Sequence, residues 1–101
     1  MNKTLVYILC GESGAYEDII HWVEGVYLYR EDAEYRLDQL NSLINKFIGD
    51  RDITELEWDE FREIETKLMN DPLGDPKFNL DYNGVRYTII ESTINTFNRS
   101  V

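Results

Sequence analysis

Only a few side chains in this sequence could carry out catalysis. His21 is the single histidine and could act as a general base, with Cys10 or Ser13 as the nucleophile that it activates. The spacing of the three residues does not enforce a catalytic triad, which favours interpreting His21 as an ordinary strand residue. We therefore expect a protein that is not an enzyme and has no catalytic residues. The alternative is a small enzyme or a ligand-binding domain centred on His21.

Phosphate-binding and metal-binding sites find little support in the sequence. Residues 11–14 (Gly-Glu-Ser-Gly) could be taken for a phosphate-binding loop, but the loop has no lysine and Glu12 would repel phosphate. Cys10 is the only cysteine, which excludes an intramolecular disulfide and a site of several thiolates. Its apolar surroundings predict a small buried core residue. The acidic residues lack the spacing of a calcium-binding loop, so we expect no metal and no cofactor.

Acidic residues are the most unusual feature of the chain. The 101 residues include 20 acidic and 10 basic side chains, which gives a net charge of −10. Eight acids between residues 50 and 65 are opposed only by Arg51 and Arg62, so this stretch alone has a net charge of −6 (eight minus two). A chain this acidic repels nucleic acids and anionic membranes, and we expect a partner protein with a basic surface instead.

Two interpretations of the acidic stretch remain open. Runs of charge are common on the solvated face of a helix, and this stretch could be such a face. The more specific interpretation is a surface that imitates the phosphates of a nucleic acid and occupies a basic groove on an enzyme. Tyrosine is enriched at binding hot spots, which adds a loop tyrosine to the candidates. The predicted partner-binding residues are Glu55, Asp59, Glu60, Glu63 and Tyr16.

Strands and a helix in the first half of the chain must position these residues. Residues 4–10 predict an interior strand, and residues 19–29 predict a second strand with a bulge or a close backbone approach at Gly25. The side chains expected to face inward from the second strand are Ile20, Trp22, Val26 and Leu28. From Asp32 a helix of about 16 residues follows and ends before Gly49. Its apolar stripe consists of Ala33, Leu37, Leu40, Ile44 and Phe47.

The second half of the chain predicts another helix. Thr54 and Glu57 have the spacing of a capping box, which places the start of this helix at residue 54 and its end near residue 69. Pro72 and Gly74 then begin a loop. The apolar stripe of the helix consists of Trp58, Phe61, Ile64 and Leu68.

A hairpin completes the predicted fold. The pair Asn83-Gly84 is typical of a type I′ turn and predicts that residues 78–82 pair with residues 85–89. Residues 1–101 are thus predicted to form a single α+β domain. It has an antiparallel sheet of about four strands, in the order β-β-α-α-β-β, and two helices packed on one face.

Three segments resemble parts of known proteins: Val6-Tyr7-Ile8-Leu9, Gly25-Val26-Tyr27 leading into Glu31-Asp32-Ala33, and Tyr87-Thr88-Ile89-Ile90-Glu91. Together they resemble a group of small, mostly uncharacterised phage and prophage proteins. In that group a strand pair runs into a helix whose first turn carries acid-acid-Ala, and a late strand completes the sheet. The resemblance implies a viral or mobile-element origin, an inserted second helix at residues 54–69, and binding of a host protein. It implies no catalytic residues.

Charge, chemistry and resemblance together predict a small acidic accessory protein that acts by non-catalytic protein binding. Its expected role is to inhibit a bacterial host or defence protein, with nucleic-acid mimicry as the most specific form. A self-assembling structural module, such as a homodimer formed through a sheet edge, is a further alternative. Neither a signal peptide nor a membrane-spanning apolar run is visible, so we expect the protein in the cytoplasm of the host cell.

Overall fold

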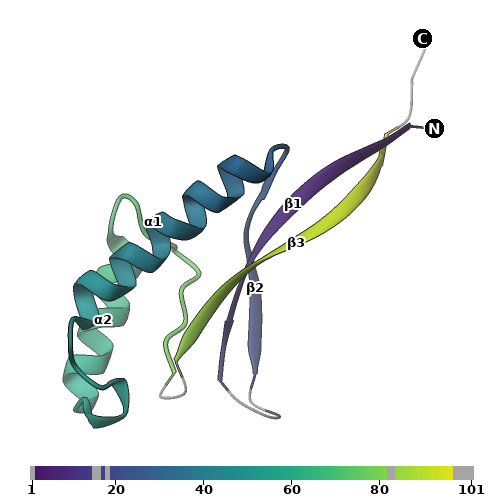
Figure 1. Ribbon diagram of the computed structural model, residues 1–101. Helices are drawn as coiled ribbons and strands as arrows, with labels where there is room; N and C mark the ends of the chain where they lie inside the picture. The colour runs from purple at the N-terminus through teal and green to yellow at the C-terminus, as the bar shows by residue number, and fades with distance from the viewer. Residues whose placement is uncertain (1, 15–16, 18, 82–83, 97–101) are drawn as a thin grey trace.

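The protein is an α+β chain in which two helices lie on the same side of an antiparallel sheet (Figure 1). The computed structural model describes residues 2–14, 17, 19–81 and 84–96. The strands form one sheet in the order β2-β1-β3. The elements are β1 (Asn2–Ser13), β2 (Ile20–Tyr27), α1 (Arg30–Ile48), the short 3-10 helix η2 (Ile53–Glu55), α2 (Trp58–Asn70) and β3 (Val85–Thr96).

The sheet has three strands in the described residues, and the prediction of about four was wrong there. Residues 78–81 form no strand, and β3 pairs with β1 along its whole length, from Asn2 opposite Thr96 to Ser13 opposite Val85. The central strand β1 therefore has a partner on each edge: β2 on one and β3 on the other.

Core burial explains why residues 78–81 do not form a strand. The side chains of Phe78 and Leu80 are buried in the hydrophobic core, and the backbone N–H of Leu80 donates to the Glu65 carboxylate of α2 at 2.9 Å. A side chain thus satisfies the backbone donor that a strand ladder would have satisfied. The predicted turn falls partly on residues 82–83, which lie outside the described residues.

The bulge predicted at Gly25 is confirmed in β2. Leu9 of β1 pairs with Gly25 and Cys10 pairs with Val23, so Glu24 is an extra residue without a partner in the ladder. A bulge changes which side of the sheet the following side chains face. Here it turns Glu24 toward the helices, where its carboxylate accepts from α1, as described below.

The bulge also corrects the predicted inward set of β2. Trp22, before the bulge, packs against the core as expected, but after the bulge Tyr27 takes that role. Val26 is 59% exposed and Leu28, beyond the strand, is 62% exposed. Ile20, at the open end of the strand, is 49% exposed. Side chains of β2 face alternate sides of the sheet before the bulge and again after it, but the alternation is interrupted at the bulge itself.

The first helix agrees with its prediction. Ala33 and Leu40 are buried, and the other stripe residues (Leu37, Ile44 and Phe47) pack against the core. Gly49 follows the helix with a φ of 65°, a conformation that glycine adopts without strain. The helix is 19 residues long because its first turn begins already at Arg30.

The second helix starts later than the capping box indicated. Asp52 accepts the backbone N–H of Thr54 at 2.9 Å and caps the 3-10 helix, and α2 begins only at Trp58. Of the predicted apolar stripe, Phe61, Ile64 and Leu68 are buried, whereas Trp58 is 59% exposed. A tryptophan at the first helical position projects beyond the edge of the core.

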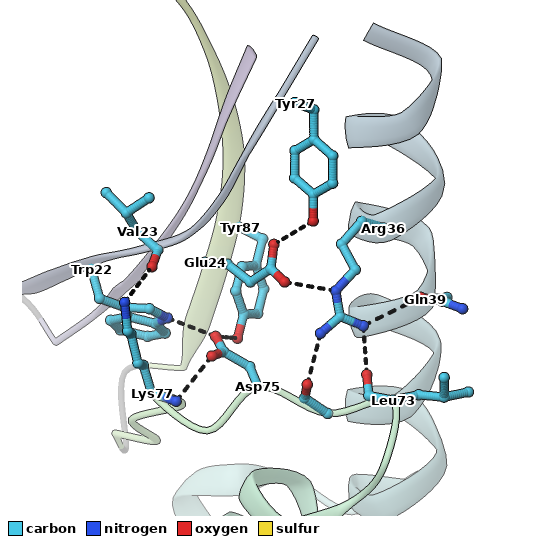
Figure 2. A network of polar contacts seen from close by, with 11 residues as sticks. Trp22, Val23, Glu24, Tyr27, Arg36, Gln39, Leu73, Asp75, Lys77 and Tyr87 are labelled. Carbon is cyan, nitrogen blue, oxygen red and sulfur yellow. Dashed lines mark hydrogen bonds and ion pairs between the residues drawn. The ribbon is translucent and has the colours of Figure 1, made fainter. Parts of the chain in front are cut away.

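A buried carboxylate joins the sheet to the loop that follows α2 (Figure 2). Asp75 is 1% exposed, and one of its oxygens accepts from Trp22 Nε1 of β2 at 2.7 Å and from the Tyr87 hydroxyl of β3 at 2.8 Å. Its other oxygen accepts the backbone N–H of Lys77 at 2.9 Å. A buried carboxylate needs such donors, because an unpaired buried charge is strongly unfavourable.

Arg36 of α1 joins the bulge in β2 to the same loop. The guanidinium of Arg36 lies 2.8 Å from the Glu24 carboxylate at the bulge, with side-chain exposures of 17% and 11%. It also donates to the backbone carbonyls of Leu73 at 2.6 Å and Gly74 at 2.7 Å. The hydroxyl of Tyr27 donates to Glu24 at 2.8 Å (Figure 2). Helix, bulge and loop are therefore held together by charged hydrogen bonds.

We expect Asp75→Ala to lower the free energy of unfolding by about 2–4 kcal/mol, because it leaves the Trp22 and Tyr87 donors buried without an acceptor. Urea denaturation measures this loss. Asp75→Asn is the matched control: its amide oxygen can still accept both donors, but its NH₂ group meets the Lys77 N–H. An intermediate loss is expected for Asn, and equal stability of all three chains would contradict the assigned role of Asp75.

A second prediction concerns alkaline pH. Burial, together with the hydrogen bond to Glu24, raises the pKa of Tyr27 to about 12, from an ordinary value near 10. The stabilisation from the protonated phenol is complete below about pH 10 and is lost as the pH rises toward 12. The stability difference between the wild type and Tyr27→Phe, which cannot ionise, should shrink over this interval in urea titrations. A difference independent of pH would contradict the prediction.

Candidate functional site

The predicted acidic residues lie on the two consecutive helical segments η2 and α2. Glu55 is on η2, while Asp59, Glu60 and Glu63 are on α2, and all four side chains are exposed. The opposite side of α2 carries its buried residues, so the core does not require these carboxylates. We call the four residues the acidic surface.

The structure pairs two of the four carboxylates with cations. Arg51 lies 3.3 Å from Glu60, and Lys67 lies 3.0 Å from Glu63 one helical turn away. Both pairs are about half exposed, where an ion pair contributes little to stability. In the described residues Glu55 and Asp59 have no ion pair. These two charges, and the two weakly paired ones, are thus accessible to a partner.

A hollow lies at the start of α2, beside the acidic surface. It has a volume of about 320 Å³, and it is lined by Asp50, Arg51, Asp52, Glu55, Leu56 and Glu60. Glu55 and Glu60 therefore line the same hollow. Asp59 and Glu63, spaced by four residues, share a neighbouring strip of the helix.

Trp58 is a candidate binding residue that the sequence did not indicate. Its ring is exposed beside the acidic surface, stacks on Phe61 at 6.1 Å between centroids, and lies 5.7 Å from the Arg62 guanidinium. An exposed tryptophan is a frequent anchor of interfaces. Its helical spacing with Phe61 suggested the core, whereas its position beside Glu57 and Asp59 was the available signal for exposure.

The tyrosine predictions have separate outcomes. Tyr16 lies outside the described residues, so its role stays a prediction. Of the two tyrosines near the end of β2, Tyr27 faces the core and Tyr29 is 65% exposed. Tyr35 of α1 is also exposed and lines a hollow of about 400 Å³ with Leu73.

The possible catalytic residues do not form a triad. Ser13 is buried on the helix side of the sheet, where its hydroxyl donates to Asn79 at 3.0 Å. His21 lies on the opposite side, 68% exposed, with its Nδ1 atom 3.8 Å from the Glu12 carboxylate. Histidine and serine are thus separated by the sheet itself.

Cys10 and His21 do share one side of the sheet. With Glu12 and Thr88 they line a hollow of about 340 Å³. Cys10 is half-buried there rather than in the core, because the pleat turns it away from the helices. Burial raises the pKa of the Cys10 thiol, which opposes its activation as a nucleophile.

The described residues contain neither a metal-binding cluster nor a helix suited to crossing a membrane. No group of three or more His, Cys, Asp or Glu side chains in these ranges is arranged to hold a metal ion. Within the same part of the chain, neither helix combines the length and the apolar character that crossing a membrane requires.

Comparison of the chain with protein-family models, with curated proteins and with solved structures finds no match.

The environment of Cys10 predicts slow alkylation. In the folded protein near neutral pH, iodoacetamide should modify Cys10 more slowly than in the urea-unfolded chain, because less of the thiol is ionised and it is half-buried. Mass spectrometry of timed samples measures both rates. Faster modification of the folded chain would reveal an activated thiolate and would favour the enzyme hypothesis.

Proposed function

We propose that this protein acts by non-catalytic binding to another protein, and that the acidic surface on η2 and α2 is the part that binds. The observation that carries the proposal is the exposure of these carboxylates on a helix whose opposite side alone is used by the core. The proposed partner has a basic surface, because the stretch from residue 50 to residue 65 has a net charge of −6.

Geometry suggests how such a partner binds. A basic side chain can approach Glu55 and Glu60 at the hollow of about 320 Å³, while Asp59 and Glu63 extend the negative potential along α2. Trp58 adds an apolar anchor at the border of the charged area. Charge thus provides steering and specificity, and the indole provides desolvated contact area.

The specific form of the proposal is a phage-type accessory protein in the cytoplasm of a bacterial host. There it inhibits a host or defence protein that normally binds nucleic acid, by occupying the basic groove with carboxylates in place of phosphates. The acidity of the chain and the resemblance of its strands and first helix to phage proteins support this form. Binding of this kind is expected to weaken strongly as salt is added.

A second candidate function is ligand binding on the other side of the sheet. The hollow that contains Cys10, Glu12, His21 and Thr88 favours it, since several polar groups converge there. A small polar ligand in that hollow would shift the NMR signals of His21 and would not depend on the acidic surface.

The charge-reversed variant Glu55→Lys, Asp59→Lys, Glu63→Lys should lose the basic partner while remaining folded. We expect the wild-type protein to capture a nucleic-acid-binding protein from bacterial lysate at low salt and to release it at high salt. The variant should bind the identified partner at least about 100-fold more weakly, since it replaces attraction by repulsion at three positions. Excess nucleic acid should displace the wild-type protein if the groove is shared.

A matched control distinguishes the effect of the acidic surface on binding from the effect of the net charge. Glu31→Lys, Glu34→Lys, Asp38→Lys changes the charge by the same amount at exposed positions of α1. It should retain the partner. Equal loss in both variants would show that only overall acidity matters, and equal retention would remove the acidic surface from consideration. Circular dichroism verifies that each variant is folded.

A further inference from the structure

The side of the sheet that faces away from the helices is uncharged over most of its length. Cross-strand neighbours point to the same side, so Ile8 lies there with Val26 and Ile90, and Cys10 lies there with Val23. We call this surface the open face; it consists of Thr4, Val6, Ile8, Cys10, Val23, Val26, Thr88, Ile90, Ser92 and Ile94. None of these residues is charged, although 30% of the chain is.

Much of the open face is accessible. Val23, Val26, Ile90 and Ile94 are 44–59% exposed, while Val6 is buried. Both helices lie on the other side of the sheet, and β1 and β3 continue beyond β2 as a twisted two-stranded ribbon (Figure 1). Apolar side chains of this size rarely remain together in water on a monomer, and such patches mark interaction sites.

We propose that the open face binds a second copy of this chain, sheet against sheet. The distribution of charge identifies this occupant. A basic partner would find only the Glu12 carboxylate at the border of this face, already paired with Arg86, whereas a second copy offers an uncharged face of the same composition. In the face-to-face pair, the acidic surfaces lie on opposite outer sides of the dimer. Association therefore keeps the two acidic surfaces apart, which limits the repulsion between chains that each carry a net charge of −10.

The size of the sheet is just sufficient for a dimer interface. Two strands of 12 residues and one of 8, at about 3.3 Å per residue and about 4.8 Å between strands, give a face of roughly 500 Å². The pair then buries about 1,000 Å², which is the minimum expected of a biological interface. Two stacked sheets would pack about 10 Å apart, with their half-exposed valines and isoleucines interlocking.

Polar residues bound the open face at one end. Arg86 lies 2.6 Å from Glu12, and Glu12 lies 3.8 Å from His21, all on the same side of the sheet. Interfaces commonly have an apolar centre and a polar border of this kind. The hollow beside His21 extends to Val23 and Ile90, so apolar side chains of a second copy have a depression to enter.

The test is sedimentation equilibrium of the full chain over roughly 1 to 100 µM, at low and at high salt. The wild-type protein should have twice the mass of the chain, and high salt should not dissociate it, because the interface is apolar. Ile90→Lys should raise the dissociation constant at least about 100-fold, tenfold from each of the two copies, since it places a charge in the interface.

Leu73→Lys is the matched control. Leu73 and Ile90 are both 52% exposed, but Leu73 lies in the loop between α2 and β3, away from the open face. The control should remain dimeric, and heteronuclear NMR should show that both variants are folded. A wild-type chain that is monomeric throughout the concentration range would overturn the proposal. So would an Ile90→Lys variant that dimerises as well as the control.

The dimer proposal is independent of the proposed function. Ile90→Lys should still capture the basic partner through its acidic surface, whereas the charge-reversed α2 variant should still dimerise. A variant that loses dimerisation but still captures the partner tests the open face alone. A variant that loses the partner but still dimerises tests the acidic surface alone.

Discussion

The buried carboxylate of Asp75 is the constraint on which the architecture depends. A loop carries it into a space between β2, β3 and the helices, where three donors surround it. The adjacent carbonyls of Leu73 and Gly74 receive Arg36 of α1, which also holds the bulged Glu24. Because β2, β3 and α1 each contribute a donor or an acceptor to this network, the loop determines how α1 sits on the sheet. It also closes the core next to α2, so the acidic surface has a fixed position.

Local patterns predicted much of the fold and little of this network. The spacing of apolar residues located both helices, because an apolar stripe such as the one that contains Leu40 or the one that contains Phe61 requires only the helical period. Gly25 correctly indicated a bulge. The Asn83-Gly84 pair suggested a strand at residues 78–82, because a turn motif shows which residues could pair but not what satisfies the backbone of Leu80. Asp75 was one acid among twenty, and only tertiary contacts distinguish it.

The candidate site was predictable in location but not in detail. The four acids of the acidic surface are exposed as expected, since charge at these densities stays in water. The sequence could not show that Arg51 reaches Glu60 or that Trp58 stands outside the core, because both depend on where α2 begins. It also gave no indication that the uncharged residues of three strands gather on one side, since the bulge at Glu24 decides which residues of β2 belong there.

Pairing of Asn2 with Thr96 has a consequence for how the chain is made. Of the three strands, the central strand β1 is synthesised first, but its longest partner, β3, is synthesised last. Such contacts between distant residues slow folding, because the intervening chain must be ordered before they form. Until β3 has been synthesised, β1 can pair only with β2 in this sheet, and one of its edges stays open. A chain with this order of elements folds late. Before it folds, the open edge of β1 can pair with a wrong strand or be bound by a chaperone.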